Sequence, residues 1–164
     1  MSAVLLDTHV LVWLLSGNAR LGVQARGFIQ HAAKINVLLV CAITLGKSPC
    51  WSARDWLALD RDVGEWVAAA LALPGIRLAP LSPEVAVAST RLPGILHADP
   101  SDHILAATAR HVDAVLVTED QRLLDYGAAG HLRVLRERRP ETVPLPHERN
   151  NGANVPKLPP VARC

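Results

Sequence analysis

Three stretches of the sequence place aspartate where an apolar strand ends or an apolar helix begins. Asp7 and Asp120 each follow a short apolar run, while Asp99 and Asp102 open an apolar helical segment. In open α/β sheets, ligands bind outside the carboxyl ends of the strands. Carboxylate oxygens are the ligands that Mg²⁺ and Mn²⁺ prefer, in an octahedral site completed by water. We therefore predict that Asp7, Asp102 and Asp120 meet in one pocket and hold a divalent cation.

The chemistry expected of such a cluster is phosphodiester hydrolysis. Carboxylates held close together repel one another, which raises their pKa values and destabilises the fold. One or two bound cations relieve that repulsion, activate a water molecule and stabilise negative charge on a phosphodiester. The pattern therefore predicts a nuclease.

Each aspartate also has a purely structural interpretation. Asp7 precedes a helix, and an aspartate in that place is, taken alone, more often an N-cap than a metal ligand. Asp99, Asp102 and Asp120 lie near helix starts, where a negative charge interacts favourably with the helix dipole. Each acid alone is weak evidence, and it is their coincidence at one edge of the sheet that favours a metal site.

Threonines and histidines accompany these aspartates. The hydroxyl of Thr8 or Thr118 either orients a carboxylate or a metal-bound water, or simply caps a helix. The three nearby histidines are spaced too irregularly for a zinc site. We interpret them as surface residues or as supports for the ligands: His9, His97 and His103.

The elements that must position these residues alternate between strand and helix. Short continuous apolar runs predict buried strands, which we place at residues 4–6, 35–41, 76–78, 114–117 and 132–135. Helical patterns fill the intervals: residues 9–16, 21–33, 60–73, 82–90, 100–112 and 121–126. Alternation of this kind predicts a parallel sheet with helices on both faces.

Length and composition indicate one domain followed by a tail. The chain has 164 residues, of which 50% are hydrophobic, and its net charge of +2 excludes a global basic field. We place the domain at residues 1–135. Residues 136–164 are basic and proline-rich, and we expect a flexible tail there. A plain disordered terminus is the favoured interpretation of this tail, and an RNA-binding segment is the alternative.

Cysteine usage and hydropathy indicate a cytoplasmic location. The three cysteines are scattered, which argues against a disulfide framework and for a reducing compartment. Asp7 interrupts the first apolar run too early for a signal peptide, and no stretch reaches the roughly 18 apolar residues of a membrane span. We therefore expect a cytoplasmic protein that does not associate with membranes.

Four segments resemble the PIN domain of VapC-type toxins, in the order and spacing of that family. They are Leu5–Trp13, Cys41–Leu45, Asp99–Ala109 and Leu116–Asp120, and the resemblance covers about residues 1–135. It implies a three-layer α/β/α sandwich with a central parallel sheet. It also implies a homodimer that cleaves RNA as a Mg²⁺- or Mn²⁺-dependent endoribonuclease, and a cognate VapB-like antitoxin that occupies the active site.

The family pattern assigns roles to four acids and differs from this chain at a fifth position. Asp7, Asp102 and Asp120 match the acidic metal ligands, and Asp99 matches an accessory acid. In the helix after the second strand, the pattern has Glu where this chain has Lys47. A positive charge there opposes cation binding, so the resemblance leaves two functions open. One is an active endoribonuclease that cuts tRNA or mRNA, and the other is a PIN fold that binds antitoxin or RNA without cleavage.

A third function is disfavoured by the sequence itself. A small α/β domain that binds a phosphorylated metabolite at a helix start would fit the same strand and helix pattern. Such sites commonly use a glycine-rich loop, and none follows the first strand here. Phosphate binding of that kind is therefore the weakest of the three interpretations.

The segment Gly46–Ser52 departs from the family pattern in a way that suggests a specific origin. Pro49 falls in what the pattern makes a helix interior, at a cost of about 3 kcal/mol. Deleting one base from a family-like gene converts Gly-Glu-Ile-Ala-Met-Leu into Gly-Lys-Ser-Pro-Cys-Trp, and one inserted base restores the frame at Ala53. We hypothesise a compensated frameshift, with ordinary divergence as the alternative, and resequencing the gene separates the two. His103 also stands where this toxin subgroup usually has Arg.

Overall fold

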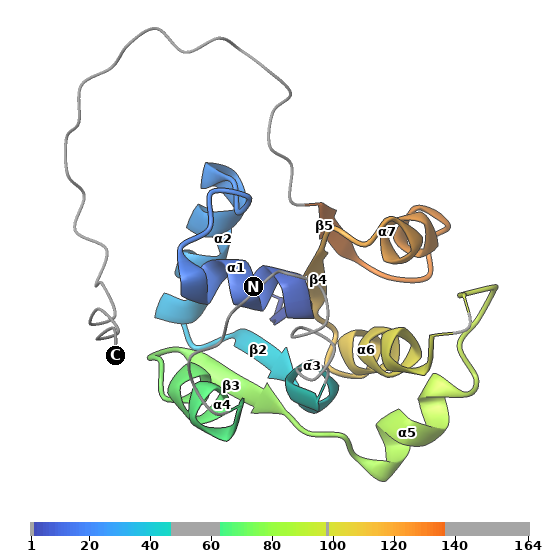
Figure 1. The fold of residues 1–164 in the computed structure, drawn as a ribbon. Helices are drawn as coiled ribbons and strands as arrows, with labels where there is room; N and C mark the ends of the chain where they lie inside the picture. Colours follow the sequence, from blue (N-terminus) through green and yellow to red (C-terminus); the bar gives the residue numbers. More distant parts are fainter. Residues whose placement is uncertain (1, 47–62, 98, 137–164) are drawn as a thin grey trace, which may run out of the picture.

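The molecule is built on a parallel sheet of five strands (Figure 1). The computed structural model describes residues 2–46, 63–97 and 99–136. The strands lie in the order β3-β2-β1-β4-β5, and every neighbouring pair is parallel. They are β1 (Val4–Leu6), β2 (Leu38–Cys41), β3 (Ile76–Ala79), β4 (Val115–Thr118) and β5 (Val134–Arg136). The predicted parallel sheet is therefore confirmed.

Helices connect the strands and cover both faces of the sheet. They are α1 (Thr8–Ser16), α2 (Val23–Lys34), α3 (Ala42–Gly46), α4 (Val63–Leu71), α5 (Pro83–Ser89), α6 (Pro100–His111) and α7 (Gln121–Ala128). Helices α1 and α2 pack on one face, while α6 and α7 pack on the other (Figure 1). This is the three-layer α/β/α sandwich that the sequence predicts.

Side chains of the central strand β1 divide the core between the two faces. Val4 and Leu6 belong to the buried cluster that includes Ile29 of α2, while Leu5 belongs to the cluster on the other face, which includes Leu105 of α6. Successive side chains of a strand point to opposite faces, so a strand covered on both sides must be apolar throughout. The three residues of β1 are all fully buried, and this strand fixes the position of whatever follows it.

Most elements begin and end within two residues of their predicted bounds, and β2 differs most. The second strand begins at Leu38, three residues later than predicted, because α2 continues to Lys34 and Asn36 turns the chain with a left-handed φ of 57°. On α2, Ile29 is buried in the core, while the neighbouring Phe28 is only partly buried. The helix after β4 has 8 residues and ends at Ala128, two residues later than predicted.

Several predictions fall outside the described residues. They concern Lys47 and Pro49, the start of the expected helix at residue 60, and the tail beyond residue 136. Within the described ranges, none of the helices is both long enough and apolar enough to cross a membrane.

Candidate metal centre

Asp7 lies directly after β1, the middle strand of the sheet. It is the N-cap of α1, and its Oδ1 accepts a 2.6 Å hydrogen bond from the backbone N–H of Thr8. Its Oδ2 accepts a second hydrogen bond of 2.6 Å from Oγ1 of Thr118. The side chain is 4% exposed, so two donors orient a carboxylate that is withdrawn from water.

Thr118 links two of the predicted ligands. It is the last residue of β4 and is fully buried. Its hydroxyl donates to Asp7, and the same oxygen accepts a 3.0 Å hydrogen bond from the backbone N–H of Asp120. One hydroxyl group therefore fixes the carboxylate after β1 relative to the chain segment after β4. The sequence predicted either a role of this kind or a helix cap for Thr118.

Asp102 projects from the first turn of α6 and is 4% exposed. Its Oδ2 lies 2.8 Å from Nε2 of His97. Asp99 caps the same helix, with Oδ1 accepting hydrogen bonds from the backbone N–H and the hydroxyl of Ser101, at 2.9 and 2.5 Å. Among the described residues, potential ligand atoms of His97, Asp99 and Asp102 all lie within 4.8 Å of one another. Asp102 is common to this group and to the predicted trio.

The electrostatics of Asp7 show that it shares its surroundings with Asp102. Burial raises the pKa of Asp7, and the negative charge of Asp102 raises it further. The hydrogen bonds from Thr118 and Thr8, together with a positive charge on His9, lower the same pKa without cancelling the rise. A second positive charge at this point, such as a bound cation, would relieve the cost of ionising Asp7.

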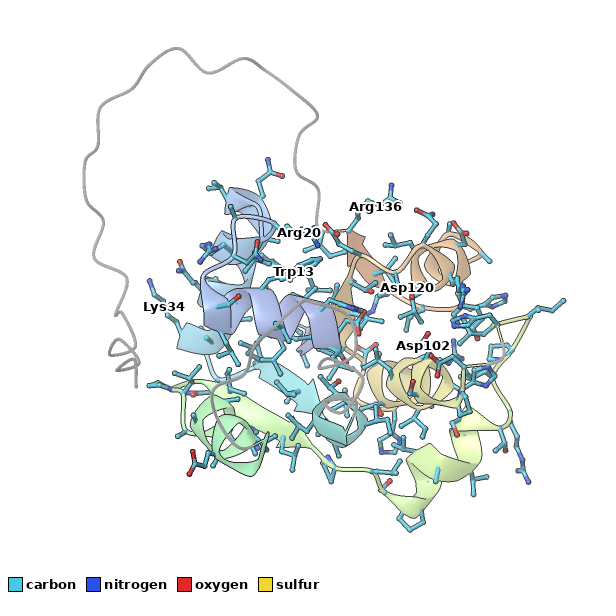
Figure 2. All side chains as sticks on the ribbon, in the orientation of Figure 1. Trp13, Arg20, Lys34, Asp102, Asp120 and Arg136 are labelled. Atoms are coloured by element: carbon cyan, nitrogen blue, oxygen red, sulfur yellow. The ribbon has the colours of Figure 1, made fainter. Side chains whose placement is uncertain are left out.

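Asp120 is the outer member of the predicted trio. It is the N-cap of α7, and its Oδ1 accepts a 2.8 Å hydrogen bond from the backbone N–H of Arg122. It is more exposed than Asp7 and Asp102. Asp7 and Asp120 both lie outside the 4.8 Å group, so Asp102 is the one member of the predicted trio within it. Figure 2 shows Asp102 and Asp120 on the same side of the molecule, where α6 and α7 begin.

The three histidines have different surroundings. His97 contacts Asp102 through Nε2, and its Nδ1 is buried without a hydrogen-bond partner among the described residues. His103 holds the backbone behind the site, since Nδ1 lies 3.2 Å from the carbonyl oxygen of Ser89 and Nε2 lies 2.7 Å from that of His97. His9 is exposed, with its ring 6.1 Å from that of Trp13. The contact of His97 with Asp102 could not be predicted from the sequence, because His97 precedes the helix in an irregular loop.

Basic side chains border the carboxylates on the side of β5 and α1. Burial raises the pKa of Glu119, and the charges of Arg20, Arg136 and His9 lower it, which places these cations around the residue before Asp120. The guanidinium carbon of Arg20 also lies 5.9 Å from the ring centroid of Trp13. In Figure 2, Arg20 and Arg136 lie near each other, on the side of Asp120 that faces away from Asp102.

The donor set of this site fits a hard divalent cation. Asp7 and Asp102 are both buried carboxylates, and the charge of Asp102 adds to the cost of ionising Asp7. Asp99 and Asp120 add oxygen ligands at the same end of the sheet. Mg²⁺ and Mn²⁺ take such oxygen ligands together with water. The single imidazole of His97 is compatible with Mn²⁺, while the majority of oxygen donors disfavours a zinc site.

Comparison with known proteins identifies the family. The family model of the PIN domain matches residues 4–129. Ribonuclease VapC22 from Mycobacterium tuberculosis (strain ATCC 25618 / H37Rv) is 32% identical in a 136-residue alignment that covers 77% of this chain and 93% of the relative.

Solved structures share the fold at lower identity. A chain of VapBC2 from Rickettsia felis, crystallised with a DNA fragment from the promoter, has a TM-score of 0.60 at 14% identity, covering 82% of this chain and 98% of its own. DNA-bound VapBC from Salmonella typhimurium has a TM-score of 0.59 at 16% identity, covering 83% and 98%. Since the family match spans nearly all of the described sheet and the Mycobacterium relative is aligned over most of its length, this chain belongs to the PIN domain family and is a homologue of VapC-type ribonucleases.

Proposed function

We propose that this chain is the toxin of a toxin–antitoxin pair, a Mg²⁺- or Mn²⁺-dependent endoribonuclease that hydrolyses RNA phosphodiester bonds. One observation carries the proposal: Asp7, at the end of the central strand of a PIN domain, is a buried carboxylate with a raised pKa beside the charge of Asp102. Two buried acids that repel each other destabilise the fold unless a cation or a proton binds there. The site therefore suits a ligand that is positively charged.

Asp7, Asp102 and Asp120 are the residues that would hold the cation, with Asp99 as an accessory acid. A divalent cation at such a site supplies an activated water and compensates charge on the phosphodiester. The chain's own residues position that chemistry. Thr118 keeps the Asp7 carboxylate and the Asp120 backbone in a fixed relation through two hydrogen bonds, while Thr8 contributes a backbone N–H to Asp7.

RNA is the proposed substrate, with tRNA or mRNA as its natural form. The name of the Mycobacterium relative, a ribonuclease, supports this class. Arg20 and Arg136 border the carboxylates, and cations beside an acidic site can bind the phosphates that flank the one being cleaved. The modest net charge of +2 means that such local cations, rather than a global field, would attract the RNA.

A VapB-like antitoxin is the proposed partner. The neighbouring structures from Rickettsia felis and Salmonella typhimurium are VapBC complexes, which supports a partner of that kind. Assembly as a homodimer, a cytoplasmic location and a flexible tail after residue 135 remain predictions from the sequence.

A second candidate function rests on Lys47, which lies outside the described residues. A lysine in place of the family's Glu adds a positive charge where the pattern places an acid. That change favours a PIN fold that binds antitoxin or RNA without cutting it.

RNA cleavage by the purified chain in Mn²⁺ or Mg²⁺ tests both functions. We expect cleavage by the parent chain, loss of it in Asp7→Ala, and faster cleavage in Lys47→Glu. Asp113→Asn is a matched control, since Asp113 is an exposed aspartate that pairs with Arg133 just before β4, at the opposite end of that strand. A parent chain that leaves RNA intact, while antitoxin or RNA still binds, would support the second function instead.

A further inference from the structure

A surface cavity of about 280 Å³ lies beside the candidate metal centre. Loop residues 95–97 form one wall of it, and side chains from α7 and the turn that follows form the other. Polar side chains that line the cavity come from His97, Arg122, Asp125, Tyr126 and His131.

Specific contacts hold the loop wall in place. The hydroxyl of Tyr126 donates a 2.6 Å hydrogen bond to the carbonyl oxygen of Pro93, and its ring lies 5.0 Å from that of His131. Burial raises the pKa of Tyr126, so the phenol remains a donor at neutral pH. Gly94 has a φ of 71°, and a Cβ there would lie 2.4 Å from Nε2 of His131. The cavity is therefore a built feature, because the loop approaches His131 as closely as only glycine allows.

The cavity adjoins the carboxylates through two residues. His97 lines it and also contacts Asp102 at 2.8 Å. Arg122 lines it and donates its backbone N–H to Asp120 at 2.8 Å. A base bound in the cavity could therefore belong to the nucleotide whose phosphodiester lies at the metal centre, since each base is joined to its own backbone phosphate.

The chemistry of the lining matches an unpaired nucleobase. Single-stranded RNA is recognised by bases that stack on aromatic, histidine or arginine side chains and that form hydrogen bonds through their edges. His131 and Arg122 offer surfaces for stacking, and Arg122 also offers donors. Asp125 is exposed and offers acceptors, one of which already receives a 2.6 Å hydrogen bond from Gln121. The volume lies just below the roughly 300–1,000 Å³ of pockets for drug-sized ligands, which suits one base.

We infer that this cavity binds one unpaired base of the RNA next to the cleaved phosphodiester, and that Asp125 favours bases with an exocyclic amino group. An ionised carboxylate only accepts hydrogen bonds. Adenine, cytosine and guanine each present an amino donor, whereas uracil presents carbonyl oxygens beside its single N–H. The inference rests on the proposed function for its substrate class, which is RNA.

Binding of short fluorescent oligo-A, oligo-C and oligo-U RNAs, measured by anisotropy, tests the inference. One series contains Ca²⁺ in place of Mg²⁺, so that a cation still neutralises the carboxylates. A parallel series contains EDTA, so that no cation is present to support cleavage. For the parent chain we expect oligo-U to bind about five- to tenfold more weakly than oligo-A or oligo-C, at the low end of a base-edge contact. Asp125→Asn should remove this preference, because an amide both donates and accepts.

Two further variants distinguish binding in the cavity from a general change in RNA affinity. Arg122→Ala should weaken binding of all three RNAs, since its stacking surface serves every base. Arg77→Ala should leave affinity and preference unchanged, because this exposed arginine lies on β3, at the opposite edge of the sheet from β5. Thermal unfolding of each variant confirms that it folds.

Equal affinity for the three RNAs, no measurable binding, or a preference that survives Asp125→Asn would each overturn the inference. Cleavage of the same RNAs in Mn²⁺ is scored separately. Cleavage without a base preference would leave the proposed nuclease standing and remove the cavity's role. A base preference that depends on Asp125, without cleavage, would support the cavity and contradict the nuclease.

Discussion

The hydroxyl of Thr118 donates to Oδ2 of Asp7 across 2.6 Å, so that the end of β4 fixes a carboxylate at the end of β1. We expect Thr118→Val to destabilise the fold by about 1–3 kcal/mol, because a buried carboxylate oxygen loses its donor. Loss of a residue that orients a metal ligand typically weakens metal binding about 10–100-fold. Calorimetric titration with Mn²⁺ measures the second effect. Thr118→Ser keeps the hydroxyl and is the matched control; equal metal affinities of the two variants would contradict the orienting role.

Stability should depend on pH through Asp7. Burial, and then the charge of Asp102, raise the pKa of Asp7 in the folded state, so the unfolded chain loses this proton first. The contribution of Asp7 to stability is complete below about pH 3.9, its unfolded value, and is lost as the pH rises through the folded pKa. Asp7→Asn in EDTA should therefore have a higher Tm than the parent at neutral pH, and the difference should disappear towards about pH 4. A Tm difference that does not change with pH would refute this account.

Bound metal should offset the loss of stability that ionisation of Asp7 causes in the parent chain. A cation that binds only the folded state stabilises it by mass action, by about 2.7 kcal/mol at a concentration 100 times Kd. We expect millimolar Mg²⁺ or Mn²⁺ to raise the Tm of the parent and to leave that of Asp7→Asn nearly unchanged. Thermal unfolding against metal concentration is the measurement, and equal shifts in both proteins would place the cation elsewhere.

Arg20 and Arg136 should contribute to RNA affinity and to its dependence on salt concentration. Each contact to a single-stranded phosphate contributes about −0.7 to the slope of log affinity against log salt. Arg20→Ala combined with Arg136→Ala should therefore weaken binding and make the slope shallower by roughly 1.4. Anisotropy at several salt concentrations gives both numbers. Arg77→Ala, on the far edge strand, should change neither, and an unaltered slope in the double variant would exclude these arginines from phosphate binding.

Two glycines should respond to alanine in opposite directions. Gly94→Ala forces a Cβ into a left-handed conformation and against His131, at a cost of about 1–2 kcal/mol. Gly27 lies within α2 with open space around it, so Gly27→Ala should stabilise the protein by about 0.5–1 kcal/mol. Urea denaturation measures both. Equal effects of the two substitutions would mean that the loop before α6 relaxes without strain.

Much of the fold could be predicted because its signals are local. The apolar run before Asp7 has a single physical meaning, a strand covered on both faces, and β1 has the predicted bounds. Asp99, followed by proline at the first helical position, likewise predicts the start of α6. The predicted start of β2 was wrong because the chain turns at Asn36, which has a left-handed conformation, and not at a glycine or proline.

The site was predictable only as far as chain order places residues at one end of the sheet. Asp7, Asp102 and Asp120 follow from strand ends and helix starts, and the structure puts them at one end of the sheet. The contact of His97 with Asp102 and the cavity beside it depend on how an irregular loop folds back on α7. The hydrogen bond from Tyr126 to Pro93 joins residues 33 positions apart, a separation that no local pattern encodes.

Three of the acids, Asp7, Asp99 and Asp120, each begin a helix, and this has a consequence for how such chains lose activity over time. An N-cap aspartate contributes about 1 kcal/mol to its helix whether or not a metal binds. A descendant that has stopped cutting RNA would still be selected to keep these three, simply to stay folded. Asp102 sits inside its helix, where Asp99 already provides the cap, so it is the acid most exposed to drift.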